Sequence, residues 1–133
     1  MSIIKKIKVF SSDDRGEISD IFSKESKDHC ALVTFTKNAI RGNHFHKQSI
    51  QSAYVLNGSF KIFNVKLDKN FNYNEKNIEE TEVTEGYYIS HSEYEAHTYK
   101  CLSNSGTLIV FTSGVRGGVD YEKDTFRLKN NLV

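Results

Sequence analysis

The stretch Ile40-Arg-Gly-Asn-His-Phe-His46 holds the side chains best suited to chemistry in this 133-residue chain. In a β-strand, side chains two positions apart point the same way, so His44 and His46 should share one face and Phe45 should take the other. An imidazole with an ordinary pKa of about 6.5 suits proton transfer at neutral pH and also binds divalent metals. The pair predicts an acid/base site or a metal site, with two exposed histidines at a strand end as the alternative.

Two more polar residues follow at a spacing that extends this site. Gln51 lies shortly after His46, and His97 follows a later turn. If a divalent metal binds, we expect His44, His46 and His97 as its ligands, and the neutral amide of Gln51 would weaken binding relative to a carboxylate. Of the remaining histidines, we expect His29 to be solvated, and we expect no functional role for His91, although it lies in the turn of the second motif.

Short strands are the elements that must position these side chains. Runs rich in β-branched and aromatic residues occur at 31–36, 52–56, 59–65 and 106–112. Asn57-Gly58 separates two of them and predicts a hairpin with a type I′ turn. Residues 66–82 are polar and Asn-rich, which indicates a loop or a hairpin excursion. Many short strands with this spacing predict an all-β sandwich or barrel.

Composition narrows the class of partner. The length fits a single domain over residues 1–133. A formal net charge of +1 argues against bulk binding to nucleic acid or to anionic lipid. The N-terminal run mixes lysines into its apolar residues, unlike a signal peptide, and no stretch approaches the ~20 apolar residues of a membrane span. We therefore expect a cytoplasmic protein with neither a nucleic-acid partner nor a membrane partner.

The order of these features resembles the two cupin motifs. His44-x-His46, a Gly-containing hairpin and a lone His97 after an intervening loop follow that pattern. The chain departs from it at Gln51, where a ligand Glu is usual, and in the second motif, where Ser92 and Tyr94 replace the usual Pro and Gly. The resemblance implies a cupin fold, which is a double-stranded β-helix or jelly-roll barrel.

A second resemblance rests on three blocks between residues 13 and 128. Asp13-Asp-Arg-Gly-Glu-Ile-Ser-Asp-Ile-Phe22 and Ile40-Arg-Gly-Asn-His44 are similar to signatures of dTDP-4-keto-rhamnose 3,5-epimerases. The second block is equally similar to that of sugar 3,4-ketoisomerases and of the cupin domain of capsular-sugar reductases. Asp120-Tyr-Glu-Lys-Asp-Thr-Phe-Arg127 resembles the closing segment of the latter two groups. The resemblance implies an isomerase of deoxysugar or surface-polysaccharide biosynthesis that acts on a dTDP- or UDP-linked 4-keto-6-deoxyhexose.

The resemblance also implies roles for individual residues. His44 matches the general base that removes a proton next to the ketone. Arg41 or His46 would stabilise the enolate, and a tyrosine would return the proton. Tyr54, Tyr88 and Tyr99 are all candidates for this tyrosine, and the sequence does not choose among them. The predicted catalytic residues are His44, His46, Arg41 and Tyr54.

Arginine is scarce in this chain, with 14 Lys against 4 Arg, and three of the four arginines precede a glycine. The diphosphate implied by the resemblance favours the bidentate contacts that a guanidinium makes and an ammonium does not. We expect Arg127 to be structural or interfacial. The predicted substrate-binding residues are Arg15, Arg41, Gln51, Tyr88, Arg116 and His97.

The proposed reaction requires no cofactor. 3,4-Ketoisomerisation is favoured over 3- or 3,5-epimerisation by a narrow margin. Two alternatives stay open: a divalent-metal-dependent dioxygenase or lyase that uses His44, His46 and His97, and a non-catalytic sugar-binding cupin. We also expect a homodimer, because small barrels of this kind leave strand edges that call for pairing.

Overall fold

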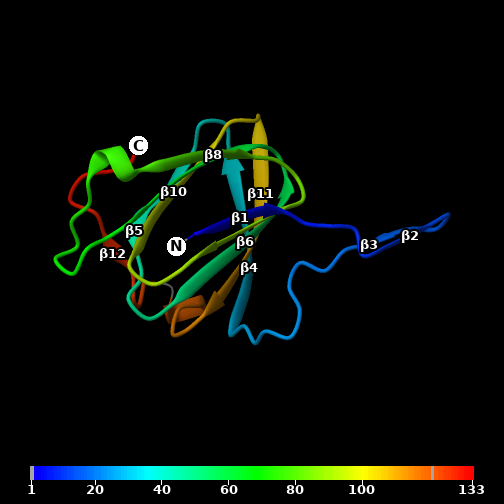
Figure 1. Cartoon of the computed structure of the whole chain (residues 1–133), viewed down its shortest axis with the longest axis horizontal. Coiled ribbons are helices and arrows are strands. Elements are labelled where there is room, and N and C mark those ends of the chain that lie inside the picture. The colour runs from blue at the N-terminus through cyan, green and yellow to red at the C-terminus, as the bar shows by residue number, and fades with distance from the viewer. Residues whose placement is uncertain (1, 121) are drawn as a thin grey trace.

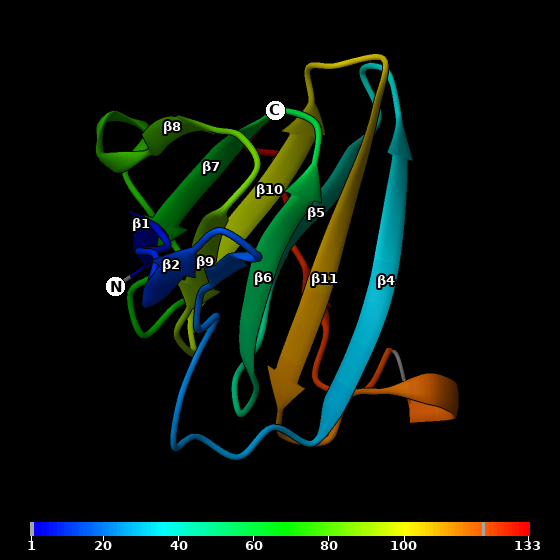
Figure 2. The same cartoon turned by 90° about the vertical axis from the view of Figure 1, so that its right-hand side faces the viewer.

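Two five-stranded antiparallel sheets face each other in the computed structural model, which describes residues 2–120 and 122–133 (Figures 1 and 2). The first sheet contains, in spatial order, β1 (Ile3–Lys6), β9 (Tyr87–His91), β6 (Ile50–Asn57), β11 (Ser105–Ser113) and β4 (His29–Thr36). The second contains β12 (Phe126–Arg127), β5 (Ile40–Phe45), β10 (Glu95–Cys101), β7 (Phe60–Lys66) and β8 (Glu79–Val83). This arrangement confirms the all-β class expected from the sequence.

A small hairpin stands apart from the two sheets. It is formed by β2 (Ser11–Asp13) and β3 (Gly16–Ile18), and it projects away from the body of the molecule (Figure 1). Two short 3₁₀ turns complete the described elements, η1 (Glu75–Asn77) and η2 (Gly118–Asp120). No helix in residues 2–120 and 122–133 is long and apolar enough to cross a membrane.

The strands form where their composition predicted them, with small changes at the turns. Gly58 between β6 and β7 has a positive φ of 89°, and a Cβ there would lie 2.7 Å from the carbonyl oxygen of Ser105. Asn57 does not have a positive φ, so the expected type I′ turn is wrong, because that turn needs positive φ at both central residues. The excursion 66–82 is completed by β8, which pairs with β7 as a hairpin.

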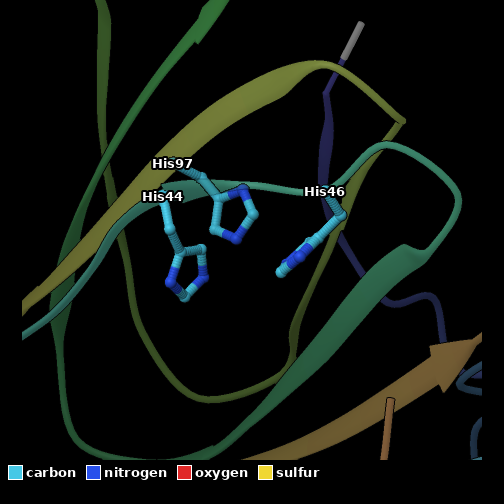
Figure 3. Close-up of side chains that lie close together, drawn as sticks. All are labelled: His44, His46 and His97. Carbon is cyan, nitrogen blue, oxygen red and sulfur yellow. The ribbon is translucent and has the colours of Figure 1, made fainter. Parts of the chain in front are cut away.

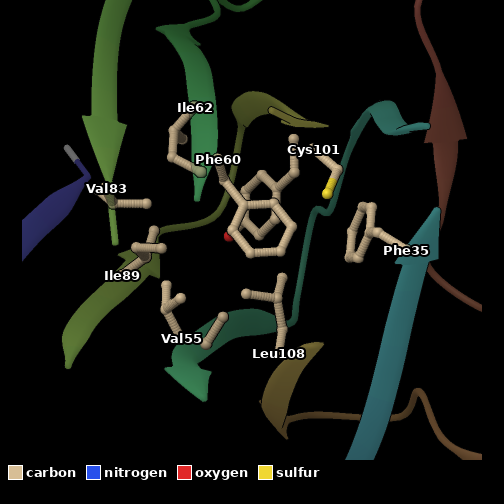
Figure 4. Close-up of a cluster of buried hydrophobic side chains, with 10 residues drawn as sticks. Phe35, Val55, Phe60, Ile62, Val83, Ile89, Cys101 and Leu108 are labelled. Atoms are coloured by element: carbon tan, nitrogen blue, oxygen red, sulfur yellow. The ribbon is translucent and has the colours of Figure 1, made fainter. Parts of the chain in front are cut away.

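The interior between the sheets changes character along the strands. Inward-facing positions alternate, so β10 contributes His97, Tyr99 and Cys101 in turn, passing from a polar to an apolar region. At the apolar end, buried side chains from both sheets form a dense cluster (Figure 4). It contains Phe35, Ala53, Val55, Phe60, Ile62, Val83, Ile89, Tyr99, Cys101 and Leu108. This core fixes the strands whose other ends carry the histidines.

Candidate active site

Three histidines predicted from the sequence meet at the polar end of the interior. His44 lies on β5 opposite His97 on β10, and His46 follows at the end of β5. The ring centroids are 4.8 Å apart for His44 and His97, 4.9 Å for His44 and His46, and 5.2 Å for His46 and His97 (Figure 3). Phe45 packs on the outer face, as the two-residue period predicted.

A cavity of about 330 Å³ opens beside these rings. His44, Gln51, His97 and Tyr99 line it, whereas His46 is buried behind them. The other lining residues are His29, Ala31, Val33, Phe35, Ile40, Arg41, Gly42, Leu108, Val110, Thr112, Arg116, Gly117 and Arg127. Among the described residues, no aspartate or glutamate lines this cavity, so its fixed charge is positive.

Gly42 allows β5 to approach β10 at the height of the histidines. Its φ is 120°, and a Cβ at this position would lie 2.6 Å from the carbonyl oxygen of His97. A side chain would therefore push the two strands apart. This requirement explains why glycine follows Arg41 in the sequence.

His44 is held by a cation at one ring nitrogen. Nη1 of Arg127 donates a hydrogen bond to Nδ1 of His44 at 2.9 Å. Nε2 of His44 is buried and has no hydrogen-bond partner among the residues described. Burial, followed by the neighbouring His46, Arg116 and Arg127, lowers the pKa of His44 to about 3, so the ring is neutral at physiological pH.

At His97 the hydrogen bond at Nδ1 runs in the opposite direction, because this ring donates and His44 accepts. Its Nδ1 donates to the backbone carbonyl of Glu95 at 3.0 Å, and its buried Nε2 has no partner within the described chain. The ring of His91 stacks on it with centroids 4.2 Å apart. Burial is the largest cause that lowers the pKa of His97 well below its ordinary value, so this ring is neutral too.

His46 is tied to the C-terminal segment rather than to the cavity. Its Nδ1 donates to the backbone carbonyl of Asp124 at 2.8 Å, while Nε2 lies 3.0 Å from Oε1 of Gln51 and 3.3 Å from Nη1 of Arg116. Arg116 also donates to Oε1 of Gln51 at 3.0 Å. Burial and then Arg116 lower the pKa of His46. This ring therefore positions Arg116 and Gln51 at the cavity wall.

Asp124, which the sequence analysis did not single out, fastens the C-terminal segment to the site. Its carboxylate accepts hydrogen bonds from the backbone N–H groups of Lys47, Gln48 and Ser49, at 2.8, 2.9 and 2.7 Å. Partial burial alone would raise the pKa of this carboxyl, but the N–H donors outweigh it and the pKa is lowered. The aspartate thus joins residues 47–49 to the strand that carries Arg127.

The arginines are distributed differently from the prediction. Arg41 and Arg116 line the cavity as expected, and Arg127, expected to be structural or interfacial, lines it as well. Arg15 does not reach the cavity of its own chain, so the structure does not bring it together with the other predicted substrate-binding residues. Its side chain is 86% exposed on the projecting hairpin and pairs with Asp13 at 2.6 Å.

The structure brings only one of the three candidate tyrosines to this cavity. Tyr54 and Tyr88 face away from the cavity, because each alternates with an inward-facing neighbour on β6 or β9. Tyr88 instead lines a separate hollow with residues 5–10 of the N-terminal segment. Tyr99 lines the cavity, and its hydroxyl lies 2.7 Å from Nε2 of His91. The signal that could have identified Tyr99 is its two-residue spacing from His97 on one strand.

The two remaining histidines also lie close to the three site histidines. His91 is fully buried, between Tyr99 and the hydroxyl of Ser2, whose Oγ lies 2.6 Å from Nδ1. His29 lies at the cavity wall beside Gly117. The sequence did not indicate either position, because neighbouring charges in sequence say little about long-range strand pairing.

A divalent metal can be tested against the bonding of the three histidines. One ring nitrogen from each of His44, His46 and His97 lies within 4.8 Å of the others, a spacing that is compatible with binding one metal ion. A ligand nitrogen must offer a lone pair, however. Arg127 occupies Nδ1 of His44 and so leaves the proton on Nε2, and Arg116 donates towards Nε2 of His46. Bonded in this way beside two fixed positive charges, the trio does not fit a metal site.

Comparison with known proteins supports the fold. No family model and no curated protein matches this sequence. Among solved structures, a 3,4-ketoisomerase from Helicobacter canadensis matches with a TM-score of 0.74 and 17% identity, over 95% of this chain and 90% of that one. QdtA, a sugar 3,4-ketoisomerase from Thermoanaerobacterium thermosaccharolyticum, matches with a TM-score of 0.72 and 21% identity, over 96% and 88%.

An epimerase matches at a similar level. The dTDP-4-dehydrorhamnose 3,5-epimerase from Elizabethkingia anophelis NUHP1 gives a TM-score of 0.73 and 16% identity, over 90% of this chain and 72% of that one. These similarities confirm the predicted cupin fold, and the matching proteins belong to two of the three groups named from the sequence, the 3,5-epimerases and the 3,4-ketoisomerases.

Proposed function

We propose that this protein is an isomerase that moves a proton at a carbon next to the ketone of a nucleotide-linked 4-keto-6-deoxyhexose. The observation that carries the proposal is a pair of buried ring nitrogens, Nε2 of His44 and of His97, with no partner in the described residues. Leaving a buried polar atom unpaired costs about 1–3 kcal/mol. Such atoms at a cavity wall are well suited to a polar ligand that satisfies them.

The charge of the cavity supports an anionic substrate. Arg41, Arg116 and Arg127 line it, and no carboxylate in the described part of the chain does so. Guanidinium groups bind phosphate oxygens in a bidentate manner, and in a partly buried site the contact is strengthened by reduced screening. A sugar linked to a diphosphate would place its neutral ring at the histidines and its charge at the arginines.

The names of the structural neighbours support the substrate class. One QdtA structure is a complex with TDP, and another, of a mutant QdtA, is a complex with TDP-4-keto-6-deoxyglucose. We propose dTDP or UDP as the nucleotide here. We propose 3,4-ketoisomerisation ahead of 3- or 3,5-epimerisation because the His44-x-His46 pattern resembles that of the ketoisomerases. The reaction as proposed needs no metal and no other cofactor.

Product analysis tests this proposal. The purified chain is incubated with dTDP- and UDP-4-keto-6-deoxyglucose, and the sugar is followed by ¹H NMR. A ketoisomerase yields a 3-keto sugar, and an epimerase yields an inverted centre at a carbon next to the ketone. Failure to convert either substrate, in protein that is folded and binds dTDP, would contradict the proposal and favour the non-catalytic sugar-binding alternative.

Two tyrosine variants provide a matched pair for the same assay. Tyr99→Phe removes the hydroxyl that bonds His91 next to a cavity-lining ring, so it is expected to slow turnover by at least about tenfold. Tyr54→Phe removes a hydroxyl on the opposite face of its strand and is expected to leave turnover unchanged. Equal losses in both variants would argue against this cavity as the site.

The metal-dependent alternative has its own discriminating measurement. Elemental analysis of chain purified without chelators should find well under one equivalent of divalent metal, because Arg116 and Arg127 already bond two of the three histidines. One tightly bound equivalent whose removal abolishes activity would support the dioxygenase or lyase alternative instead.

A further inference from the structure

The arginines of the cavity lie in different surroundings. Arg41 is exposed at the rim, where its guanidinium carbon lies 5.3 Å from the ring centroid of Phe35 and its Nη2 donates to the carbonyl of Thr34 at 3.2 Å. Arg116 is only 7% exposed. Because water and salt screen an exposed charge much more than a buried one, the two guanidinium groups suit different parts of a substrate.

Arg116 lies at the same end of the cavity as His44. Arg41 precedes His44 by three residues on β5, which separates their Cα atoms by about 10 Å. Nη1 of Arg116 instead lies 3.0 Å from Oε1 of Gln51 and 3.3 Å from Nε2 of His46. Burial and then His46 lower the pKa of His44, and the charge of Arg116 is the next cause. The buried cation therefore lies where the sugar ring would react, and the exposed cation lies at the rim.

The loop that carries Arg116 is docked on both sides of this residue. Before it, the backbone N–H of Gly114 donates to the carboxylate of Asp28 at 2.8 Å. After it, a Cβ at Gly117 would lie 2.7 Å from the ring of His29, so the chain approaches this ring closely only because the residue is glycine. These contacts fix the guanidinium in advance, which is the preorganisation that stabilisation of a developing charge requires.

Gln51 and His46 orient the guanidinium of Arg116 without cancelling its charge. One contributes a neutral amide oxygen, and the other contributes a ring nitrogen whose partner, Nδ1, carries the proton. A guanidinium has five N–H donors in one plane, so it can keep both contacts and still offer a pair of parallel donors to a ligand. A lysine ammonium would supply the charge but not this planar fork.

We propose that Arg116 is the catalytic cation of this site and that its fork binds both O3 and O4 of an enediolate formed from the sugar. In 3,4-ketoisomerisation, two oxygens on neighbouring carbons share the negative charge, and both lie in the plane of the double bond. A guanidinium matches such a pair of oxygens as it matches a carboxylate. This inference rests on the proposed function and specifies which residue stabilises its intermediate.

The chemical step balances without an oxidant or a reductant. The C3–H bond breaks, its proton passes to the general base of the site, and its electron pair forms the C3=C4 double bond while the C4 ketone oxygen becomes an oxyanion. The proton of the O3 hydroxyl moves to O4 beside the donors of Arg116. C4 then takes a proton from the base or from solvent, and the electron pair on O3 forms the C3 ketone. Arg116 stays protonated throughout, because a guanidinium is not deprotonated in proteins.

The ratio of two rates tests the fork. With dTDP-4-keto-6-deoxyglucose in deuterated buffer, deuterium at C3 of recovered substrate reports the enediolate, and the 3-keto sugar reports completed transfer of the ketone. Both are followed by ¹H NMR. Arg116→Lys keeps the charge but loses the fork, so ketone transfer should fall about 10²-fold and exchange at C3 only about tenfold. Arg116→Met has neither charge nor fork and should lose about 10²- to 10³-fold in both rates.

Arg41→Lys is the matched variant at the rim. It makes the same change at an exposed position, so it should weaken dTDP binding by about tenfold and leave the ratio of exchange to transfer unchanged. Both Arg116 variants should bind dTDP within about threefold of the unmodified chain, which also shows that they fold. A greater loss of dTDP binding in Arg116→Lys than in Arg41→Lys would overturn the inference, because it would place Arg116 at the diphosphate.

The outcomes separate this inference from the proposed function. If the unmodified chain moves the ketone and Arg116→Lys keeps the same ratio of exchange to transfer, the function stands and the role of Arg116 is wrong. If the unmodified chain inverts a centre next to the ketone and forms no 3-keto sugar, the isomerase class stands and the binding of two oxygens is wrong. If it neither exchanges a ring proton nor converts either nucleotide sugar, the proposed function itself fails.

Discussion

Four of the five histidines are buried in one half of the barrel, and all four are neutral there. Burial is the first cause that lowers the pKa of each of them, and nearby cations or other histidines add to the effect. His44 and His91 both reach a pKa of about 3. A fixed charge follows, because rings that do not titrate near neutral pH stay uncharged there.

This neutrality predicts a loss of stability in mild acid. The folded pKa of His44 lies below its unfolded value of about 6.5, so the unfolded chain binds more protons between these values and the free energy of unfolding rises with pH. The stability is fully present above about pH 6.5 and is lost as the pH falls towards about 3. Each such histidine contributes up to about 1.4 kcal/mol per pH unit within that window.

Urea unfolding at pH values between about 7 and 5 measures this slope, in a range where most carboxylates stay ionised. His44→Leu is the matched variant, because it removes one buried titrating ring. It should reduce the slope of the free energy of unfolding against pH by up to the contribution of one histidine. An unchanged slope in the variant would show that His44 titrates normally in the folded chain.

Among the elements, β5 and β10 depend on glycine for their close approach. Gly42→Ala would place a Cβ 2.6 Å from the carbonyl of His97, with φ at 120°, so we expect it to destabilise the chain by about 2–4 kcal/mol and to weaken dTDP binding. Gly16→Ala is the matched control, because its φ is 133° and a Cβ there meets nothing within 4 Å. Urea unfolding of Gly42→Ala reports backbone strain together with the steric contact to His97. Urea unfolding of Gly16→Ala reports backbone strain alone. Equal destabilisation would contradict the role of the close approach.

The C-terminal segment is anchored to the rest of the fold by one carboxylate, that of Asp124. Asp124→Ala removes the acceptor of three backbone N–H groups and should lower the free energy of unfolding by about 1–3 kcal/mol. Asp120→Ala, which breaks only an exposed pair with Lys123, should change it by less than about 0.5 kcal/mol. Urea titrations of both variants check this. Similar values for the two would mean that Asp124 does not hold the segment.

The same elements show how far the sequence could predict the site. Alternation along one strand correctly placed His44 and His46 on a shared face, and the spacing of the cupin motifs brought His97 to them. Alternation could also have favoured Tyr99 over Tyr54. Sequence patterns do not reveal the register between distant strands. Arg127 reaches His44 only because β12 pairs with β5. Arg15 misses the cavity because it lies on a hairpin outside the two sheets.

At the scale of the whole molecule, the projecting hairpin leaves apolar side chains in solvent. Phe10 is 76% exposed and Ile18 60% exposed. β1 pairs with β9 of its own sheet, so the hairpin rather than β1 carries the unpartnered apolar surface. We propose that a second copy covers it and that the chain is a homodimer.

Sedimentation velocity at micromolar concentration tests the assembly. We expect a dimer for the unmodified chain and a shift towards monomer for Phe10→Glu, because a buried charge without a partner opposes association. Val119→Glu, which replaces a fully exposed apolar residue away from the hairpin, is the control and should stay dimeric. A monomeric unmodified chain would contradict the proposal.

Deuterium exchange tests the proposed proton transfer most directly. The chain is mixed with dTDP-4-keto-6-deoxyglucose in deuterated buffer, and the ¹H signals of the carbons next to the ketone are followed over time. We predict that deuterium enters at one of these carbons far faster than in buffer alone. Folded chain that binds dTDP yet leaves every ring proton in place, with the UDP sugar as well, would contradict the proposed function.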